Sequence, residues 1–122
     1  MKFSEADTSS GLTIRAYEPG AIAIGEARFT HSVLLTPDRV TDWPPVDVPS
    51  IEPVHFEPVL ELKPELLILG TGVKQAFPSP QTYAALMTGG IGIEIMDTGA
   101  ACRTYNILIA EGRRVAAALI IG

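Results

Sequence analysis

The chain has 122 residues, of which 47% are hydrophobic and 19% are charged, and its formal net charge at pH 7 is −5. This length favours a single domain, and the hydrophobic content argues against an intrinsically disordered chain. Phosphate binding requires clustered positive charge, so the acidic balance and the scattered Lys and Arg residues exclude nucleic acid as the expected partner. The chain has one cysteine and two histidines, so we expect no intrachain disulfide, no metal and no cofactor.

The apolar runs are no longer than strands, and each is well short of the roughly 20 residues that a membrane-spanning helix needs. Residues 1–11 are polar, and we expect them to form a flexible entry to a single α/β domain over residues 12–122. The first seven residues contain neither an apolar signal core nor an Arg-rich stretch. We therefore expect a soluble, cytoplasmic protein that does not insert into a membrane.

The first third of the chain predicts short antiparallel strands. Leu12, Ile14 and Ala16 alternate with more polar side chains, which is typical of a half-buried strand. The turn at residues 18–20 leads into the apolar run Ala21–Ile24, which would pair back as a hairpin. Further short strands are expected at residues 26–30, 32–36 and 40–43.

All prolines except Pro19 lie between residues 37 and 80, and their spacing allows no long helix or central strand between residues 44 and 58. We expect an ordered crossing loop with one short helix near residues 56–62. A loop of this length is either functional or packed by its own side chains, and its apolar residues favour packing. Trp43 is either an exposed anchor for a protein partner or a core residue, and the sequence leaves both open.

The chain from Leu66 onward alternates strands and helices with short connections, which predicts α/β units around a mostly parallel sheet. The spacing indicates strands at residues 66–69, 91–96 and 115–121, with helices at residues 80–88 and 98–111. Ser79 is the expected N-cap of the first helix. Asp97 or Thr98 would cap the second, and Gly112 stands where a left-handed residue ends it.

Gly70-Thr71-Gly72 follows a buried strand, which is where open α/β sheets bind ligands. Lys74 would add a positive charge there for a small anion. A dinucleotide-binding motif would need a third glycine and a helix that opens at once, and this chain has neither. A tight turn with close packing is therefore the favoured interpretation of the two glycines.

Glu94 is an acid inside the strand at residues 91–96, on the face opposite the isoleucines. If that face is covered, the carboxylate needs a partner such as Arg103 or a raised pKa. An ordinary strand-edge or ion-paired residue is the favoured alternative to a cleft acid. Arg103 and Asn106 share the face of the second helix opposite its apolar stripe.

Cys102 lies near the start of a helix, where a thiolate nucleophile is stabilised. It also shares the apolar stripe of that helix with Tyr105 and Ile109, which favours a buried structural cysteine. No general base stands out, because His31 and His55 lie in the distant first half of the chain. Both histidines are expected at the surface or in turns.

Three runs carry a resemblance to a known family: Gly70-Thr71-Gly72, Gly-Ile-Glu-Ile-Met-Asp-Thr at residues 92–98, and Ala-Cys-Arg-Thr-Tyr-Asn-Ile-Leu at residues 101–108. The chain resembles, over about residues 10–121, the domain of unknown function shared by bacterial proteins and mitochondrial complex I assembly factor 3. The resemblance implies a compact three-layer α/β domain with a mixed central sheet. It also implies protein partners, either assembly proteins or subunits of the respiratory NADH:quinone oxidoreductase. It supplies no catalytic residues, and the positions that recur in the family are here Gly70, Gly72, Glu94, Thr98, Arg103, Thr104, Tyr105 and Asn106.

Two functions remain open from the sequence. The favoured one is a non-enzymatic binding or assembly module, with Trp43 as a candidate contact and a homodimer as a possible state. The alternative is a small-molecule-binding protein or enzyme with a cleft at residues 70–74. The candidate ligand-binding residues of that cleft are Gly70, Thr71, Gly72, Lys74, Glu94, Arg103, Thr104 and Asn106.

Overall fold

The central sheet has five strands in the order β5–β4–β8–β6–β7 in a computed structural model that describes residues 12–122. Their bounds are β4 Val33–Leu35, β5 Val40–Asp42, β6 Leu66–Gly70, β7 Gly92–Met96 and β8 Val115–Leu119. β6 pairs in parallel with β7 and β8, whereas β4 is antiparallel to β5 and β8. The sheet is therefore mixed, as expected. The predicted flexible entry, residues 1–11, lies outside the described residues.

The first three strands form a separate antiparallel sheet. They are β1 (Ile14–Glu18), β2 (Ala21–Ile24) and β3 (Ala27–Phe29), in the order β1–β2–β3. Gly20 turns the chain between the first two with φ +94°, a conformation that side chains disfavour and glycine accepts. The predicted hairpin is confirmed, and the predicted antiparallel front third is divided between this sheet and one side of the central sheet.

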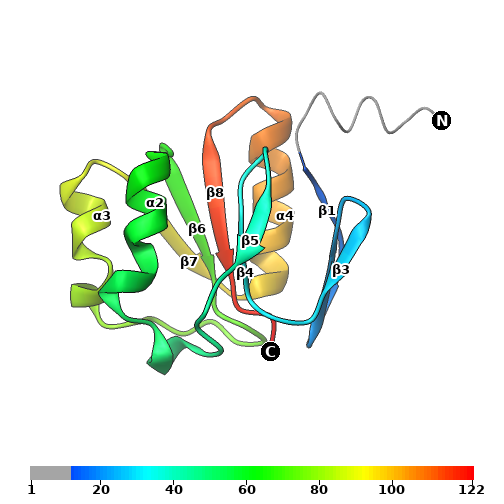
Figure 1. The fold of residues 1–122 in the computed structure, drawn as a ribbon, viewed down its shortest axis with the longest axis horizontal. Coiled ribbons are helices and arrows are strands. Elements are labelled where there is room, and N and C mark those ends of the chain that lie inside the picture. Colours follow the sequence, from blue (N-terminus) through cyan, green and yellow to red (C-terminus); the bar gives the residue numbers. More distant parts are fainter. Residues whose placement is uncertain (1–11) are drawn as a thin grey trace.

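Figure 1 shows the central sheet from its β5 edge, with elements packed on both of its faces. Helix α4 (Thr98–Ala110) and the β1–β3 sheet cover one face, and α2 (Glu57–Leu62) and α3 (Ala84–Thr88) cover the other. Because both faces of β6 are covered, its residues Leu67, Ile68 and Leu69 are all fully buried. The predicted three-layer α/β architecture is confirmed.

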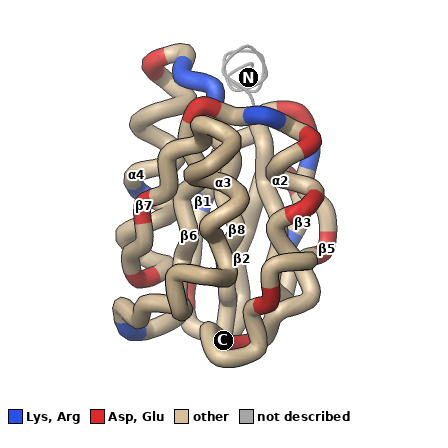
Figure 2. The backbone as a smooth tube through the Cα atoms, turned by 90° about the vertical axis from the view of Figure 1, so that its left-hand side faces the viewer, with Lys and Arg blue, Asp and Glu red and all other residues tan. Residues whose placement is uncertain are grey.

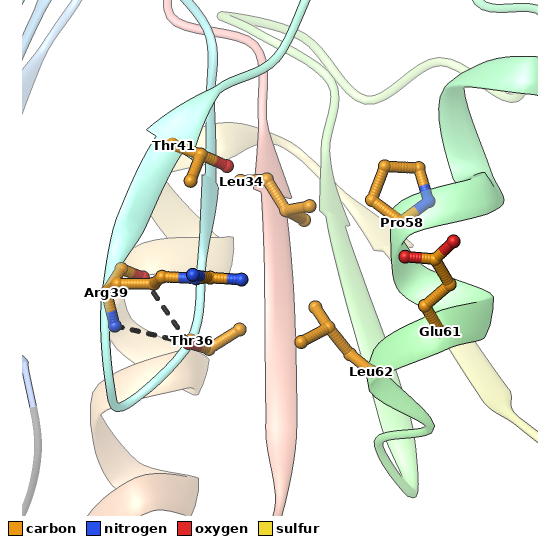
Figure 3. Close-up of a pocket in the computed structure, with 7 residues that line it drawn as sticks. All are labelled: Leu34, Thr36, Arg39, Thr41, Pro58, Glu61 and Leu62. Carbon is orange, nitrogen blue, oxygen red and sulfur yellow. Dashed lines mark hydrogen bonds between the residues drawn. The ribbon is translucent and has the colours of Figure 1, made fainter.

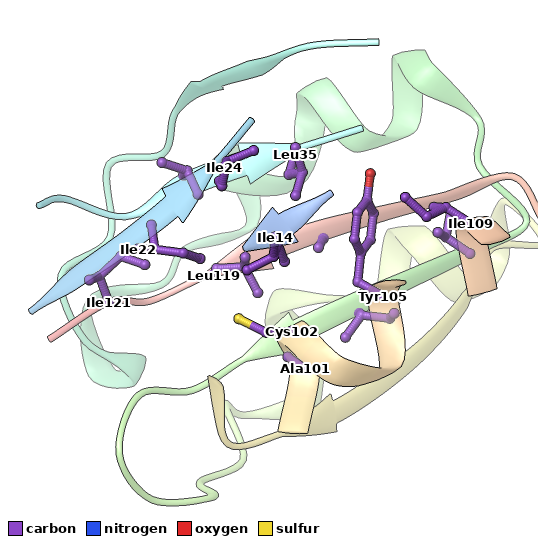
Figure 4. Packing of buried hydrophobic residues seen from close by; sticks show 14 residues of the cluster. Ile14, Ile22, Ile24, Leu35, Ala101, Cys102, Tyr105, Ile109, Leu119 and Ile121 are labelled. Atoms are coloured by element: carbon purple, nitrogen blue, oxygen red, sulfur yellow. The ribbon is translucent and has the colours of Figure 1, made fainter. Parts of the chain in front are cut away.

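The core on the α4 side joins three elements that are far apart in the sequence. Tyr105 and Cys102 point from α4 into a cluster that includes Ile14 and Ile22 of the β1–β3 sheet and Leu119 of β8 (Figure 4). Tyr105 is fully buried, and Cys102 is 6% exposed. The stripe of apolar residues predicted for this helix therefore faces the core, as helical spacing requires.

The core on the α2 side is built largely by the proline segment. Trp43, Ile51, Phe56 and Val59 pack with Leu86 of α3 against the opposite face of the sheet. Two short 3₁₀ turns, η1 (Val48–Ser50) and η2 (Pro53–Phe56), lead this segment into α2. The long loop is therefore packed by its own side chains, and the short helix expected near residues 56–62 is present.

The helix predicted over residues 80–88 is interrupted. The chain makes a 3₁₀ turn, η3 (Pro80–Thr82), and α3 begins only at Ala84, because Tyr83 adopts φ −118° and ψ 13°. The Ser79 side chain makes no capping bond. Instead its carbonyl accepts a hydrogen bond from Thr82 Oγ1 at 2.7 Å. A single α-helix with a Ser79 cap was therefore the wrong prediction for this segment.

Helix α4 follows the sequence prediction closely. The Asp97 side chain caps it by accepting a hydrogen bond from the Ala100 amide at 2.9 Å. Gly112 has φ +79°, and the Arg113 amide donates to the Leu108 carbonyl, so the helix ends in a left-handed glycine turn. Of the two candidate N-caps, Asp97 takes that role and leaves the Thr98 hydroxyl available for another.

Figure 2 shows the α2 and α3 side of the molecule, where the tube of α3 carries no charged position and the Lys, Arg, Asp and Glu positions lie around it. Across residues 12–122, no helix is both long enough and apolar enough to cross a membrane.

Candidate functional site

The Gly-Thr-Gly turn lies at the end of β6, beside the ends of its parallel neighbours β7 and β8. A Cβ at Gly70 would lie 2.9 Å from Thr98 Oγ1 and 3.1 Å from Thr98 Cα, so only glycine allows α4 to start this close to the strand. Gly72 has φ +100°, which again favours glycine. The turn therefore lies where a ligand site was predicted. The close approach of Thr98 explains the glycine at position 70, and the positive φ angle explains the glycine at position 72.

Two threonine hydroxyls hold this turn. Thr98 Oγ1 accepts a hydrogen bond from the Gly72 amide at 2.8 Å and donates to the Ile120 carbonyl at 2.6 Å, and all of these atoms are buried. Thr71 Oγ1 donates to the Lys74 carbonyl at 2.7 Å and accepts from the Ala76 amide at 3.2 Å. The polar groups of the turn thus form hydrogen bonds with other groups of the same chain.

The last residues of the chain fill the space above the strand ends. The Ile120 amide donates to the Gly70 carbonyl, and the Ile121 carbonyl accepts from the Gly20 amide, both at 2.9 Å. A Cβ on Gly72 would lie only 3.2 Å from the Gly122 carbonyl oxygen. The edge where open α/β sheets bind ligands is therefore occupied by the tail at residues 120–122.

The other residues predicted for the cleft are spread over the surface. Lys74, Glu94 and Arg103 are exposed, and Glu94 lies on β7, the edge strand of the sheet. The three cavities described for residues 12–122 are lined by none of the eight predicted ligand-binding residues. Ligand binding by this set stays a prediction, and the surface position of Glu94 agrees with the favoured strand-edge alternative.

Asn106 has a structural role that was not predicted. Its Nδ2 donates to the Ile14 carbonyl at 2.8 Å, and its Oδ1 accepts from the Ile14 amide at 2.9 Å. One side-chain amide thus satisfies both backbone groups of a β1 residue, as a neighbouring strand would. Asn106 therefore fastens α4 to the β1–β3 sheet, and ligand binding by Asn106 stays a prediction. Thr104 is half-buried, and its side chain has no hydrogen bond among the described residues.

Cys102 is not prepared for nucleophilic chemistry. Burial raises the pKa of its thiol to about 12 and outweighs the nearby Arg103 guanidinium, which lowers the pKa, while the negative charge of Asp97 raises it by a smaller amount. A thiol with this pKa is neutral at physiological pH, where only the thiolate would attack. The favoured interpretation, a buried structural cysteine, therefore fits the structure.

The two histidines lie in turns, apart from Cys102. His55 Nδ1 accepts a hydrogen bond from the Glu52 amide at 2.9 Å, and His31 Nε2 lies 3.5 Å from Asp42 Oδ1 at an exposed position. Within residues 12–122, no group of three His, Cys, Asp or Glu side chains is arranged to hold a metal ion.

Trp43 belongs to the core and is not an exposed anchor. Its side chain is 3% exposed, its Nε1 donates to the His55 carbonyl at 2.9 Å, and its ring centre lies 5.8 Å from that of Phe56. The indole is buried because the proline segment folds back over it. Of the two possibilities that the sequence left open, this burial favours the core residue, and partner contact by Trp43 stays a prediction. The exposed apolar side chains of this segment are Val46 and Val54.

A hollow that the sequence analysis missed lies between the β4–β5 hairpin and α2 (Figure 3). It measures about 400 Å³, which is within the range of small ligand sites, roughly 300–1,000 Å³. Arg39 extends into it from the hairpin, and Glu61 faces it from α2. We call this hollow, lined by Leu34, Thr36, Arg39, Thr41, Pro58, Glu61 and Leu62, the hairpin groove. Its two charged residues look like ordinary surface charges in the sequence, which gives no signal of their proximity.

The model of a single protein family matches residues 14–120, nearly the whole described part of the chain. The chain belongs to the family of proteins of unknown function DUF498/DUF598. Solved structures similar to this chain include a protein from Bordetella parapertussis that is 40% identical, with a TM-score of 0.85 over 91% of this chain and 96% of that one. The predicted family resemblance and fold class are thereby confirmed.

Two curated relatives carry descriptive names. The "13 kDa major membrane protein" of Francisella tularensis is 26% identical and aligns over 98% of this chain and 99% of its own length. The "NADH dehydrogenase [ubiquinone] 1 alpha subcomplex assembly factor 3" of Danio rerio is 31% identical over 98% of this chain and 70% of its own length. The human protein of the latter name is 30% identical, and this DUF498/DUF598 chain spans 64% of its length.

Proposed function

We propose that this chain is a protein-binding module that assists the assembly of the respiratory NADH:quinone oxidoreductase. The observation that carries the proposal is the similarity, along almost the whole chain, to proteins named as assembly factors of that enzyme. The buried thiol and the self-satisfied turn at residues 70–72 are consistent with binding in place of catalysis. Protein partners are accordingly proposed in preference to a small-molecule substrate.

The surface offers apolar side chains for such contacts. Val46, Val73, Phe77, Met87 and Ile107 are each at least 59% exposed. Apolar groups that stay exposed in a folded chain gain the most when a partner covers them. They lie on several elements, so the partner contacts of an assembly module of this kind need not involve a cleft.

The experiment that tests the proposal is affinity capture from the cells that make the protein. The tagged chain is expected to recover subunits of the NADH:quinone oxidoreductase or its assembly proteins, in amounts well above those recovered by a tagged acidic domain of similar size. Deleting the gene is expected to lower the amount of assembled enzyme on native gels, with restoration by the reintroduced gene. Normal enzyme levels together with no captured subunit would contradict the proposal.

We propose that the protein acts in the cytoplasm and is not inserted into the membrane. A salt wash of isolated membranes is expected to release any membrane-bound fraction, because the described chain offers no spanning helix. Retention after a carbonate wash would contradict this location and would match the name of the Francisella relative. Sedimentation of the purified chain tests the homodimer at the same time.

A further inference from the structure

Among residues 12–122, no strand pairs with the outer edge of β5 in the central sheet. β5 is the last strand in the sheet order, and it lies at the front of Figure 1 with no other element drawn over it. Trp43 donates to the Ser32 carbonyl, and Thr36 donates to the Arg39 carbonyl, so the hydrogen-bonded pairs of this antiparallel ladder include Thr41 with Leu34. The backbone amides and carbonyls of Val40 and Asp42 therefore point away from the sheet, toward solvent.

The hairpin groove lies directly beside this open edge. Successive side chains of a strand alternate between the two faces of its sheet, and Arg39 and Thr41 both line the groove on the α2 side. Helix α2 packs beside the β4–β5 hairpin, so Leu34, Pro58 and Leu62 form an apolar floor and wall of the groove between them. A strand added next to β5 would place every second side chain over this groove.

The groove has one charge of each sign on its opposite walls. Arg39 and Glu61 reach toward the hollow from the hairpin and from α2 (Figure 3). The two ion pairs formed within residues 12–122 are His31–Asp42 and Arg113–Glu65, so neither groove charge is committed to a partner of its own. A ligand that carried an acid and a base on either side of an apolar group would meet complementary charges at both walls.

We infer that the hairpin groove binds a short extended segment of a partner protein, which adds as a strand to β5. The inference rests on the proposed protein-binding function and names its contact surface. Backbone hydrogen bonds to Val40 and Asp42 supply affinity, and the groove selects the side chains. An apolar side chain enters between Leu34 and Leu62, with an acidic residue two positions away facing Arg39 and a basic residue facing Glu61.

The length of the segment follows from the edge itself. β5 has three residues, with the hairpin turn before it and Pro44–Pro45 after it. A proline has no amide hydrogen to donate, so pairing cannot continue past Trp43. The bound segment is thus about five residues long, of which three side chains at alternate positions face the groove.

The probe is an acetylated and amidated peptide with glutamate, leucine and lysine at alternate positions and threonine between them. Its binding to the ¹⁵N-labelled full chain is followed by nuclear magnetic resonance. We expect saturable shifts at Leu34, Thr41 and Leu62, together with slower hydrogen exchange of the Val40 and Asp42 amides. A peptide N-methylated on its threonines loses the backbone donors and is expected to give neither effect. Binding that leaves exchange at Val40 and Asp42 unchanged would overturn strand addition.

Charge reversal tests the selection of side chains. R39E is expected to lower the affinity for the probe about fivefold, which is the contribution of one favourable surface ion pair. The R39E variant is also expected to bind a probe with lysine in place of glutamate more tightly than the original probe. R28E on β3 is the matched control, because Arg28 is also exposed and lies on the other sheet. Leu62→Ser is expected to lower the affinity for the probe, whereas Met87→Ser on α3 is expected to leave it unchanged. Equal affinity for all four variants would overturn the assignment of the groove.

Two outcomes separate this inference from the proposed function. If R39E and Leu62→Ser still capture the same respiratory subunits as the unaltered chain, the groove assignment fails and the assembly function stands. If the unaltered chain captures no subunit but binds the probe, the assembly function fails instead. Exchange protection of Val40 and Asp42 in the chain alone, rising with concentration as a dimer forms, would show that a second copy occupies the edge and would overturn the inference.

Discussion

The hydroxyl of Tyr105 is a buried polar group. The side chain is fully buried, and its hydroxyl has no hydrogen-bond partner among residues 12–122. Burial also raises the pKa of this phenol well above its ordinary value. Its ring, and not its hydroxyl, accounts for the packing in Figure 4.

We predict that Tyr105→Phe raises the free energy of unfolding by about 1 kcal/mol, because a buried hydroxyl without a partner is removed while the ring remains. Urea denaturation followed by circular dichroism measures the change. Tyr83→Phe is the matched control, because Tyr83 is half-buried and its replacement is expected to have little effect. A loss of stability in Tyr105→Phe would mean that the hydroxyl is hydrogen-bonded in solution.

The raised pKa of the Cys102 thiol predicts that the free energy of unfolding depends on pH. This thiol has a pKa of about 12 in the fold, against about 8.5 in an unfolded chain. Above pH 8.5 the unfolded chain releases this proton and the folded chain keeps it, so the stability that the neutral thiol contributes declines as the pH rises toward 12. Cys102→Ala is therefore expected to lose less stability than the unaltered chain between pH 8.5 and 11. Parallel stability curves over that range would contradict the raised pKa.

At the scale of elements, Asn106 joins α4 to β1. The sequence placed this residue on a polar helix face, and only the fold shows that β1 covers that face. We predict that Asn106→Ala destabilises the chain by about 1–3 kcal/mol, because both backbone groups of Ile14 lose their partner. Thr104→Ala on the same helix is the control, with an expected change within about 0.5 kcal/mol.

Hydrogen exchange locates the effect of Asn106→Ala. The Ile14 amide is expected to exchange faster in this variant, while amides of β6 keep their protection relative to global unfolding. A uniform acceleration across all strands would indicate a general loss of stability and would contradict a local fastening role.

Elements with a regular spacing could be predicted from the sequence, and contacts between them could not. The apolar stripe of α4 and its Asp97 cap follow from local rules, as does the glycine at its end. The burial of Trp43 depends on the proline segment returning over it, which no local pattern encodes. The interruption at Tyr83 was missed because Pro80 suits an α-helix and a 3₁₀ turn equally well.

The place of the turn at residues 70–72 in the fold could be predicted, and its surroundings could not. A glycine turn after a buried strand correctly marked the ends of the parallel strands. No local pattern indicates that residues 120–122 return to that edge. The hairpin groove was missed because Arg39 and Glu61 line the same hollow only through the packing of α2 beside the hairpin.

At the scale of the whole molecule, the tail at residues 120–122 ties the layers together. Ile120 belongs to the core on the α2 side and Ile121 to the core on the α4 side, and both are nearly fully buried. The same residues bond to the turn at Gly70 and to the β1–β2 turn at Gly20. A tail that contacts both cores should make them unfold as one unit.

We predict that Ile121→Ala lowers the free energy of unfolding by about 2–5 kcal/mol and shifts the unfolding of both cores equally. Trp43 is the one tryptophan of the chain and lies in the opposite core, so its fluorescence reports on the face that the substitution does not touch. The urea midpoint from this fluorescence is expected to match the midpoint from far-ultraviolet circular dichroism in the unaltered chain, in Ile121→Ala and in Ile120→Ala. Ile120→Ala serves as the matched variant because it removes the same atoms from the Trp43 side. A fluorescence midpoint that stays in place in Ile121→Ala while the dichroism midpoint falls would show that the two cores unfold separately, and the tail would then be a contact of each core without coupling them.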